Sequence, residues 1–188
     1  MVAKLKELLY DVNTPDDSVD VELPGQLGQY KITNYRLPLL TWKKNVAIND
    51  FYFVPAANGS AADFNVAIGK DDSHFNTKSS GMVISTPLGS TGLALSAGGA
   101  ILSPNSGVLE AVPMLPHTLT SRPIIVPDTD VITVSWDRKV QVFADGRLVD
   151  DFGEGAVTIK CKKRKIRIVQ PTSWDFFENL KHKMKWHS

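Results

Sequence analysis

The sequence KSSGMVISTPLGSTGLALSAGGAILSP occupies residues 78–104 and decides the fold. It opens with Met82–Ile84, an apolar and partly β-branched run that is typical of the end of a strand. Pro87 and Gly89 break this run, and residues 93–97 can then form a short helix before two glycines stop it. The order predicts a strand, a tight glycine-containing turn and the start of a helix.

A turn of this composition can bind a ligand. Small residues let the backbone approach a bound group closely, and the free N–H groups at a helix N-terminus suit a phosphate. Many turns rich in Gly, Ser and Thr nevertheless connect a strand to a helix and bind nothing. The stretch is neither a Walker loop, because no Gly-Lys-Ser/Thr ends it, nor a Gly-x-Gly-x-x-Gly fingerprint. The turn chemistry alone leaves both interpretations open.

Two long motifs resemble those of the NAD kinase family. Residues 85–102 read STPLGSTGLALSAGGAIL and are similar to the family's STPTGSTAYxLSAGGPI. Residues 112–127 read VPMLPHTLTSRPIIVP and resemble its PxxPHxLxxRPxVxP. Weaker matches are Ala47–Asp50 to the family's ALNE, residues 144–146 to its DG, and residues 174–186 to its closing YF..L..KL.W. The resemblance covers nearly the whole chain, but only the C-terminal domain of the family.

The resemblance and the strand pattern lead to one fold class, mainly β. Short alternating apolar runs recur at roughly 8–12-residue spacing in the second half of the chain, which indicates a sandwich-like, mostly antiparallel domain. Asp145-Gly146 predicts a hairpin turn. We expect a single domain over residues 1–188, similar to the β-sandwich of the NAD kinase C-terminal domain. A short helix should follow the glycine-rich turn, with terminal helices over residues 2–9 and 174–186.

Composition excludes several classes of protein. With 43% hydrophobic and 22% charged residues, the chain is globular and large enough for a sizeable core. The net charge of +1 implies no global attraction to nucleic acid, and the single cysteine, Cys161, forbids an internal disulfide. No apolar run approaches the about 20 residues of a membrane helix, and the N-terminus lacks the pattern of a signal peptide. We therefore expect a cytoplasmic protein with no membrane contact.

The resemblance implies a pocket for a dinucleotide. By position in the family's motifs, its residues here are Asn49, Asp50, Ser80, Thr91, Gly92, Leu93, Ser96, Leu115 and His117. In NAD kinases the Asn-Glu pair at positions 49–50 contacts the ribose and adenine side of the dinucleotide. The residues alone favour a structural role, because an unpaired buried polar group costs about 1–3 kcal/mol and the backbone can supply its partners. The resemblance reverses that preference for Asn49.

Two departures from the family pattern change the expected pocket. The family has Ser-Asp-Gly where this chain has Ser79–Gly81, so Ser80 replaces a carboxylate that contacts the dinucleotide. The family's Thr-Ala-Tyr is Thr91–Leu93 here, which removes an aromatic ring near the adenine. Stacking of that kind contributes about 1–3 kcal/mol. We therefore expect a ligand preference that differs from the family's.

The resemblance also points to a missing half. The family's N-terminal α/β domain carries a Gly-Gly-Asp-Gly motif whose Asp is the general base, and residues 1–188 contain no such motif. Phosphoryl transfer is mostly positioning and charge neutralisation of the triphosphate. With Met1 at the boundary of the family's C-terminal domain, we expect a stand-alone domain that binds NAD, or a related adenine or ADP-ribose nucleotide, without phosphorylating it. It would act by sequestration or sensing and would require no further cofactor.

Two other hypotheses stay open. In the first, the chain is a fragment or subunit of an ATP-dependent NAD kinase, converting NAD to NADP with a separate Gly-Gly-Asp-Gly domain. In the second, the basic run 160–167 binds nucleic acid, although a charged hairpin tip is usually solvated and no aromatic platform accompanies it. The resemblance further implies a homo-dimer or tetramer, with Leu115 and His117 near a shared site. His117 has no second metal ligand at a suitable spacing, so we expect a hydrogen-bonded structural histidine and no metal site.

Overall fold

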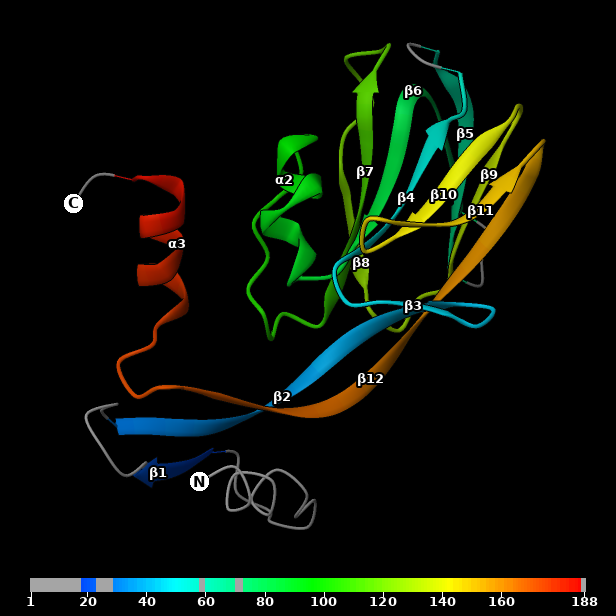
Figure 1. The fold of residues 1–188 in the computed structure, drawn as a ribbon. Helices are drawn as coiled ribbons and strands as arrows, with labels where there is room; N and C mark the ends of the chain where they lie inside the picture. Colours follow the sequence, from blue (N-terminus) through cyan, green and yellow to red (C-terminus); the bar gives the residue numbers. More distant parts are fainter. Residues whose placement is uncertain (1–17, 23–28, 58–59, 70–72, 187–188) are drawn as a thin grey trace. The chain divides into compact units, whose positions relative to one another are not determined.

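The computed structural model describes residues 18–22, 29–57, 60–69 and 73–186. In chain order its elements are β1 (Ser18–Glu22), β2 (Gln29–Trp42), β3 (Asn45–Ala47), β4 (Asp50–Pro55), β5 (Ala62–Ile68), β6 (Ser73–Ser85), the 3-10 turn η1 (Gly89–Thr91), α2 (Leu93–Ser96), β7 (Val108–Pro116), β8 (Ile124–Pro127), β9 (Ile132–Trp136), β10 (Val140–Ala144), β11 (Arg147–Phe152), β12 (Gly155–Pro171) and α3 (Phe176–Met184) (Figure 1).

The chain divides into two compact units. One comprises residues 37–164, and the other comprises residues 1–36 with 165–188. All nine residues expected to line a pocket lie in the first unit. The single domain expected for the whole chain stays a prediction.

β6 is the strand around which the unit 37–164 is built. Residues 73–79 of β6 pair with β5, and residues 82–85 pair with β4. The opposite edge of β6 pairs with β7, which in turn pairs with β8. β5 continues to β9 and β4 continues to β10, so two branches of the sheet leave one strand (Figure 1). Every strand pair with a described register is antiparallel, as the sequence pattern predicts.

The two branches share one hydrophobic core. Phe53 of β4 and Trp136 of β9 belong to different branches, yet their ring centroids lie 5.5 Å apart. Val142 of β10 and Val157 of β12 are fully buried in the same cluster. Large apolar side chains removed from water on both inner faces are the main stabilising contribution to such a fold. The mainly β, sandwich-like fold expected from the sequence is confirmed.

Gly81 lies where β6 passes from one branch to the other. Phe75, before it, packs against the core from an odd position, whereas Met82 and Ile84, after it, are core residues at even positions. Alternation has period two in a strand, so the inward side changes between these segments. A Cβ at residue 81 would lie 2.7 Å from the carbonyl oxygen of Phe53, and glycine is therefore required at this crossing.

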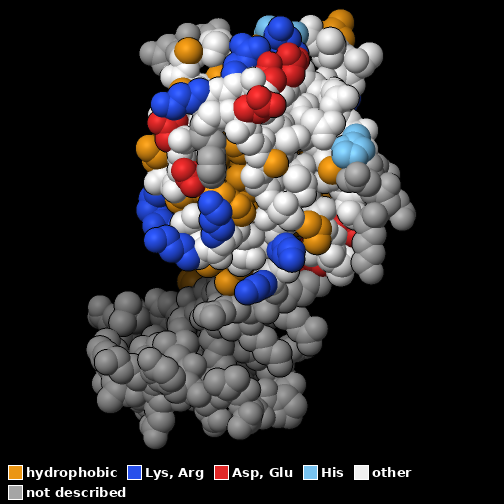
Figure 2. Space-filling model, turned by 90° about the vertical axis from the view of Figure 1, so that its right-hand side faces the viewer, with side chains coloured by type: hydrophobic (Ala, Val, Ile, Leu, Met, Phe, Trp, Pro, Cys, Tyr) orange, Lys and Arg blue, Asp and Glu red, His pale blue; other side chains and the backbone are white. Residues whose placement is uncertain are grey.

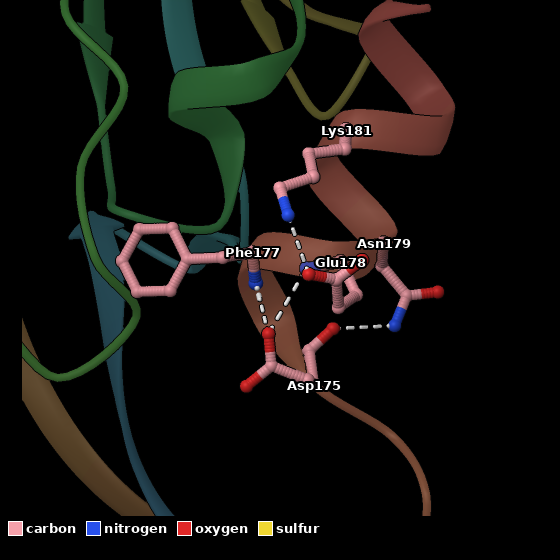
Figure 3. A network of polar contacts seen from close by, with 5 residues as sticks. All are labelled: Asp175, Phe177, Glu178, Asn179 and Lys181. Carbon is pink, nitrogen blue, oxygen red and sulfur yellow. Dashed lines mark hydrogen bonds and ion pairs between the residues drawn. The ribbon is translucent and has the colours of Figure 1, made fainter. Parts of the chain in front are cut away.

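In the second unit, Asp175 begins α3 (Figure 3). Its carboxylate accepts the backbone N–H groups of Phe177 and Glu178, each at 2.9 Å, which is the usual role of an N-cap residue. Glu178 in the first turn also pairs with Lys181 at 2.6 Å. Acidic groups at the start and basic groups at the end complement the helix dipole. The expected C-terminal helix is confirmed, within the range 174–186.

Three expectations about local structure have different outcomes. The helix expected over residues 2–9 lies outside the described residues. The helix after the glycine-rich turn is confirmed as α2, although it is only four residues long and η1 precedes it. The hairpin tip expected in the basic run 160–167 is wrong, because this run lies inside the continuous strand β12. The run contains no Gly, Pro, Asn or Asp that would end a strand.

The surface of the described part is mixed in character. Figure 2 shows one face on which basic and acidic side chains both occur, with small hydrophobic patches between them. Within the described residues, no helix has the length and apolar content needed to cross a bilayer.

Candidate functional site

The carboxylate of Asp145 holds the turn between β3 and β4. Its Oδ2 accepts the backbone N–H of Ile48 at 2.8 Å, while its Oδ1 accepts those of Asn49 at 2.8 Å and Asp50 at 3.3 Å. Asp145 and Gly146 have φ angles of 47° and 77°, the left-handed pair that closes a two-residue hairpin between β10 and β11. The expected hairpin is confirmed, and its first residue also fixes a turn almost a hundred residues earlier in the chain.

The glycine-rich segment, defined here as residues 86–102, is fastened to the same turn. Thr86 donates its Oγ1 to the carbonyl of Ile48 at 2.6 Å and its backbone N–H to the carbonyl of Asn49 at 2.9 Å. Gly89 packs directly on this backbone. A Cβ at residue 89 would overlap the carbonyl oxygen of Asn49 and lie 2.6 Å from its carbonyl carbon. Backbone contact this close admits only glycine.

In the turn between β3 and β4, two polar side chains have no hydrogen-bond partner among the described residues. The amide of Asn49 is exposed, and Asp50 is 7% exposed with no hydrogen bond to its carboxyl from the described part of the chain. Burial, and then the charge of Asp145, raise the pKa of Asp50 to about 6. Burial, and then the charge of Asp50, raise the pKa of Tyr52. An amide and a carboxyl placed side by side can bind the hydroxyl and ring-nitrogen groups of a nucleoside.

α2 rests on the outer face of the sheet. Ala94 is buried against Val83 of β6 and Val112 of β7, and Leu93 and Tyr52 pack against the same small cluster. These apolar contacts stabilise a four-residue helix that would not be stable alone.

Ser90 ties the two ends of the glycine-rich segment together. Its Oγ donates to the carbonyl of Pro87 at 2.7 Å and accepts the backbone N–H of Leu102 at 3.0 Å. Ser90 itself is fully buried. The segment is therefore a closed loop, because residues near its two ends bond to the same buried hydroxyl.

Six of the nine expected site residues lie in or next to this arrangement. Asn49 and Asp50 belong to the turn between β3 and β4. Gly89 packs on that turn, and the next three expected residues follow Gly89 along the chain, from the end of η1 to the start of α2: Thr91, Gly92 and Leu93. The sixth is Ser96 in α2. It is exposed, and its hydroxyl donates to the carbonyl of Gly92 at 3.4 Å.

Ser80, Leu115 and His117 form a second group, further along β6 and β7. Ser80 precedes the end of β6 by five residues, about 16 Å along a strand. Leu115 is 76% exposed and has a φ angle of 46°, which is uncommon for a bulky side chain. The backbone N–H of His117 donates to the carbonyl of Lys78 at 2.8 Å. Its ring is exposed and makes no hydrogen bond with the described residues, which does not support a structural histidine.

α2 packs close to the second group as well. Leu93 packs in the same apolar cluster as Met114, and Met114 immediately precedes Leu115 in β7. The structure thus places six of the expected residues at the turn between β3 and β4 and in or before α2, and the other three further along β6 and β7.

Sequence reasoning missed two residues that build the site. Thr86 enters the sequence analysis only as part of a motif, and Asp145 only as part of a hairpin turn and of a weak motif match. Asp145 could have been suspected from the run VAINDFYF, because a turn there exposes backbone N–H groups that need an acceptor.

One pocket lies away from the expected site residues. An open pocket of about 620 Å³ lies near Asp63, Trp136, Asp137 and Glu154, and none of the nine expected site residues lines it. No cluster of three or more potential metal ligands occurs in the part of the chain that the structure describes.

Known proteins with similar sequences point to one family. Residues 48–170 match the family described as the ATP-NAD kinase C-terminal domain. An NAD kinase of Shewanella woodyi is 34% identical over 187 residues, which cover 93% of this chain and 64% of the relative. An NAD kinase of Shewanella loihica is 36% identical over 149 residues, which cover 77% of this chain and 51% of the relative.

Solved structures agree on the fold. An NAD kinase from Archaeoglobus fulgidus in complex with ATP has a TM-score of 0.69 at 26% identity, covering 82% of this chain and 61% of that one. Yeast NADH kinase complexed with NADH has a TM-score of 0.72 at 24% identity, covering 84% and 51%. The chain spans about half to two thirds of the length of these proteins. By sequence and by fold, this chain belongs to the ATP-NAD kinase family, and its match lies in that family's C-terminal domain.

Proposed function

We propose that this chain binds NAD or a related adenine or ADP-ribose nucleotide, and that residues 1–188 alone do not phosphorylate it. The observation that carries the proposal is the turn at Asn49 and Asp50. Its backbone is fixed by Asp145 and Thr86, while its two side chains keep their hydrogen-bonding capacity. The ATP in the archaeal NAD kinase and the NADH in yeast NADH kinase support a ligand of this class.

The fixed backbone favours binding for an energetic reason. A ligand that meets a preorganised turn does not have to order it, so less of the interaction free energy is lost on association. Gly89 packs η1 against the same turn, and Thr91 and Gly92 follow Gly89 within three residues, which supports their contact with a group held by Asn49. Ser80, where the family has a carboxylate, supports a ligand preference different from the family's.

The absence of phosphoryl transfer follows from the chemistry that residues 1–188 lack. They contain no Gly-Gly-Asp-Gly motif to supply the general base and hold the triphosphate. A domain that binds without turnover would act by sequestration or sensing.

A second candidate function is supported by the length comparison. Because the chain spans 51% and 64% of two NAD kinases, it fits one half of a complete ATP-dependent enzyme equally well. In that case NADP should form when the chain is mixed with a Gly-Gly-Asp-Gly domain, NAD, ATP and Mg²⁺. NADP formation by residues 1–188 alone would overturn the primary proposal.

Titration calorimetry tests the binding proposal. We expect NAD, NADP or ADP-ribose to bind to the wild-type chain, and Asn49→Ala to weaken that binding about tenfold, the effect of losing one or two ligand hydrogen bonds. Asn105→Ala is the matched control, because Asn105 lies in an exposed turn after α2 and its loss should leave the affinity unchanged. Absence of binding to all three nucleotides would contradict the proposal.

The affinity should also depend on pH through Asp50, whose pKa is raised to about 6. An ionised carboxylate accepts hydrogen bonds from ribose hydroxyls, so affinity should rise with pH and fall by up to about tenfold per pH unit below that value. In the free protein, the stability of the fold depends on pH in the opposite direction to the affinity. Because the pKa is raised by folding, ionisation of Asp50 removes stability between the ordinary value of 3.8 and about 6.

Calorimetry with NAD across this range measures the effect. Asp50→Asn should bind more weakly and lose the rise of affinity with pH, whereas Asp63→Asn, which removes an exposed carboxylate, should keep both the affinity and its rise with pH. An unchanged pH profile in Asp50→Asn would exclude this carboxyl from the ligand site.

Assembly is a further part of the proposal. Leu115 and Leu119 are 76% and 86% exposed at the end of β7, which supports contact with a second copy of the chain there.

A further inference from the structure

Glu110 is a fully buried carboxyl near the start of β7. It pairs with Ser85 of β6 on one side and with Ile125 of β8 on the other. Ser85 in turn pairs with Asp50 of β4, so Asp50, Ser85 and Glu110 form one row across three strands. The row lies beneath the glycine-rich segment, because Gly89 packs on Ser85.

The carboxyl of Glu110 is in close contact with the end of that segment. Its Oε2 accepts the backbone N–H of Ala100 at 3.0 Å. A Cβ at Gly99 would lie 2.8 Å from the same oxygen and 2.9 Å from the carbonyl oxygen of Ala94. The other oxygen, Oε1, is buried and has no hydrogen-bond partner among the described residues. One oxygen holds the turn 98–102, and the other is unsatisfied.

No ion pair to this carboxyl occurs within the part of the chain that the structure describes. The turn 98–102 and β8 contain no titratable residue, and neither does the neighbouring part of β6. Asp50 lies two strands away in the same row, and Asp128 follows β8; a negative charge on either would repel a charge on Glu110. Burial raises the pKa of Glu110, and the Ala100 N–H only partly offsets that increase. A buried charge without a partner is strongly unfavourable.

We propose that Glu110 is a positioning residue. In its neutral form it holds the turn 98–102 against β7, which we call the seated state, and its ionisation releases this turn. The seated turn stabilises the loop above it, because Leu102 donates to Ser90 at the other end of the segment. The effect on nucleotide affinity rests on the proposed function, whereas the release of the turn does not.

The sign of the pH dependence follows from the raised pKa. The seated state holds the proton more tightly than the open state, whose carboxyl has an ordinary pKa of about 4.3. Seating is therefore fully favourable below that value and is lost as the pH rises through the higher pKa of the seated state. Glu110→Gln mimics the neutral carboxyl, keeps an acceptor for the Ala100 N–H and removes the titration.

Hydrogen exchange of the Ala100 and Leu102 amides, measured by NMR without ligand, tests the proposal. In the wild-type chain their protection factors should fall by up to about tenfold per pH unit above about pH 4.5. In Glu110→Gln they should be higher near neutral pH and independent of pH. Amides of β10 serve as the reference for global opening, and any slope left in Glu110→Gln reports on other groups such as Asp50.

Equal pH slopes in wild type and Glu110→Gln would overturn the proposal, as would protection that rises with pH in the wild type. A second measurement concerns nucleotide affinity at neutral pH, where Glu110→Gln should bind NAD several-fold more tightly than the wild type. If neither protein binds NAD, the proposed function fails while the exchange result still decides the role of Glu110.

Discussion

We expect Gly89→Ala to lower the free energy of unfolding by about 3 kcal/mol and to remove the proposed nucleotide binding. The added methyl group would overlap the carbonyl oxygen of Asn49 and lie 2.6 Å from its carbonyl carbon and 2.7 Å from the hydroxyl oxygen of Ser85. The first two are backbone atoms of a turn that Asp145 and Thr86 already hold, so they cannot move without breaking those hydrogen bonds. Denaturant unfolding measures the loss of stability, and calorimetry with NAD measures the loss of binding.

Gly153→Ala is the matched control, because a Cβ at residue 153 would meet nothing within 4 Å. It should leave stability within about 0.5 kcal/mol of the wild type, as expected for a surface substitution. Wild-type stability and affinity in Gly89→Ala would show that the glycine-rich segment does not rest on the turn at Asn49.

Asp145→Asn has the second large effect, a loss of about 3 kcal/mol of stability. The carboxylate accepts three backbone N–H groups, and hydrogen bonds to a charged acceptor are stronger than neutral ones. Asparagine keeps the shape and tolerates the φ of 47°, but it has one acceptor oxygen. Its NH₂ group would face a backbone N–H of the turn, so at least one donor in this part of the chain is left unpaired.

A charge effect distinguishes this substitution from general destabilisation. The charge of Asp145 contributes to the raised pKa of Asp50, so the pKa of Asp50 should fall in Asp145→Asn. Carbon-13 NMR of the side-chain carboxyl follows this titration. Asp151→Asn, which removes an exposed charge on β11 paired with Lys139, should change neither the stability nor that titration appreciably. An unshifted pKa of Asp50 would mean that the two carboxyls do not interact.

The sequence predicts local structure well where the signal is local. Gly89 and Pro87 mark the end of β6, and Asp145-Gly146 marks a hairpin, because each relies on the backbone preferences of adjacent residues. The basic run in β12 shows the limit of such reasoning. Its charges suggested a surface tip, yet nothing in it breaks a strand, and the backbone continues through it.

The site depends on contacts that no local pattern contains. The hydrogen bonds from residues 48–50 to Asp145 join positions 95–97 residues apart. Glu110 likewise stands in an apolar run, and only the fold shows that Ala100 is its partner. Motif resemblance predicted the residues of a ligand site, whereas the residues that hold the turn at Asn49 and the segment 98–102 in place became visible only in three dimensions.

The shared strand β6 has a consequence for protein engineering. Because residues 73–85 belong to both halves of the sandwich, neither half keeps a closed interior if the chain is cut there. Split-protein fragments and circular permutants of this domain must therefore keep those thirteen residues intact. New termini would be better placed at the exposed turn around Asn105, where no strand is interrupted.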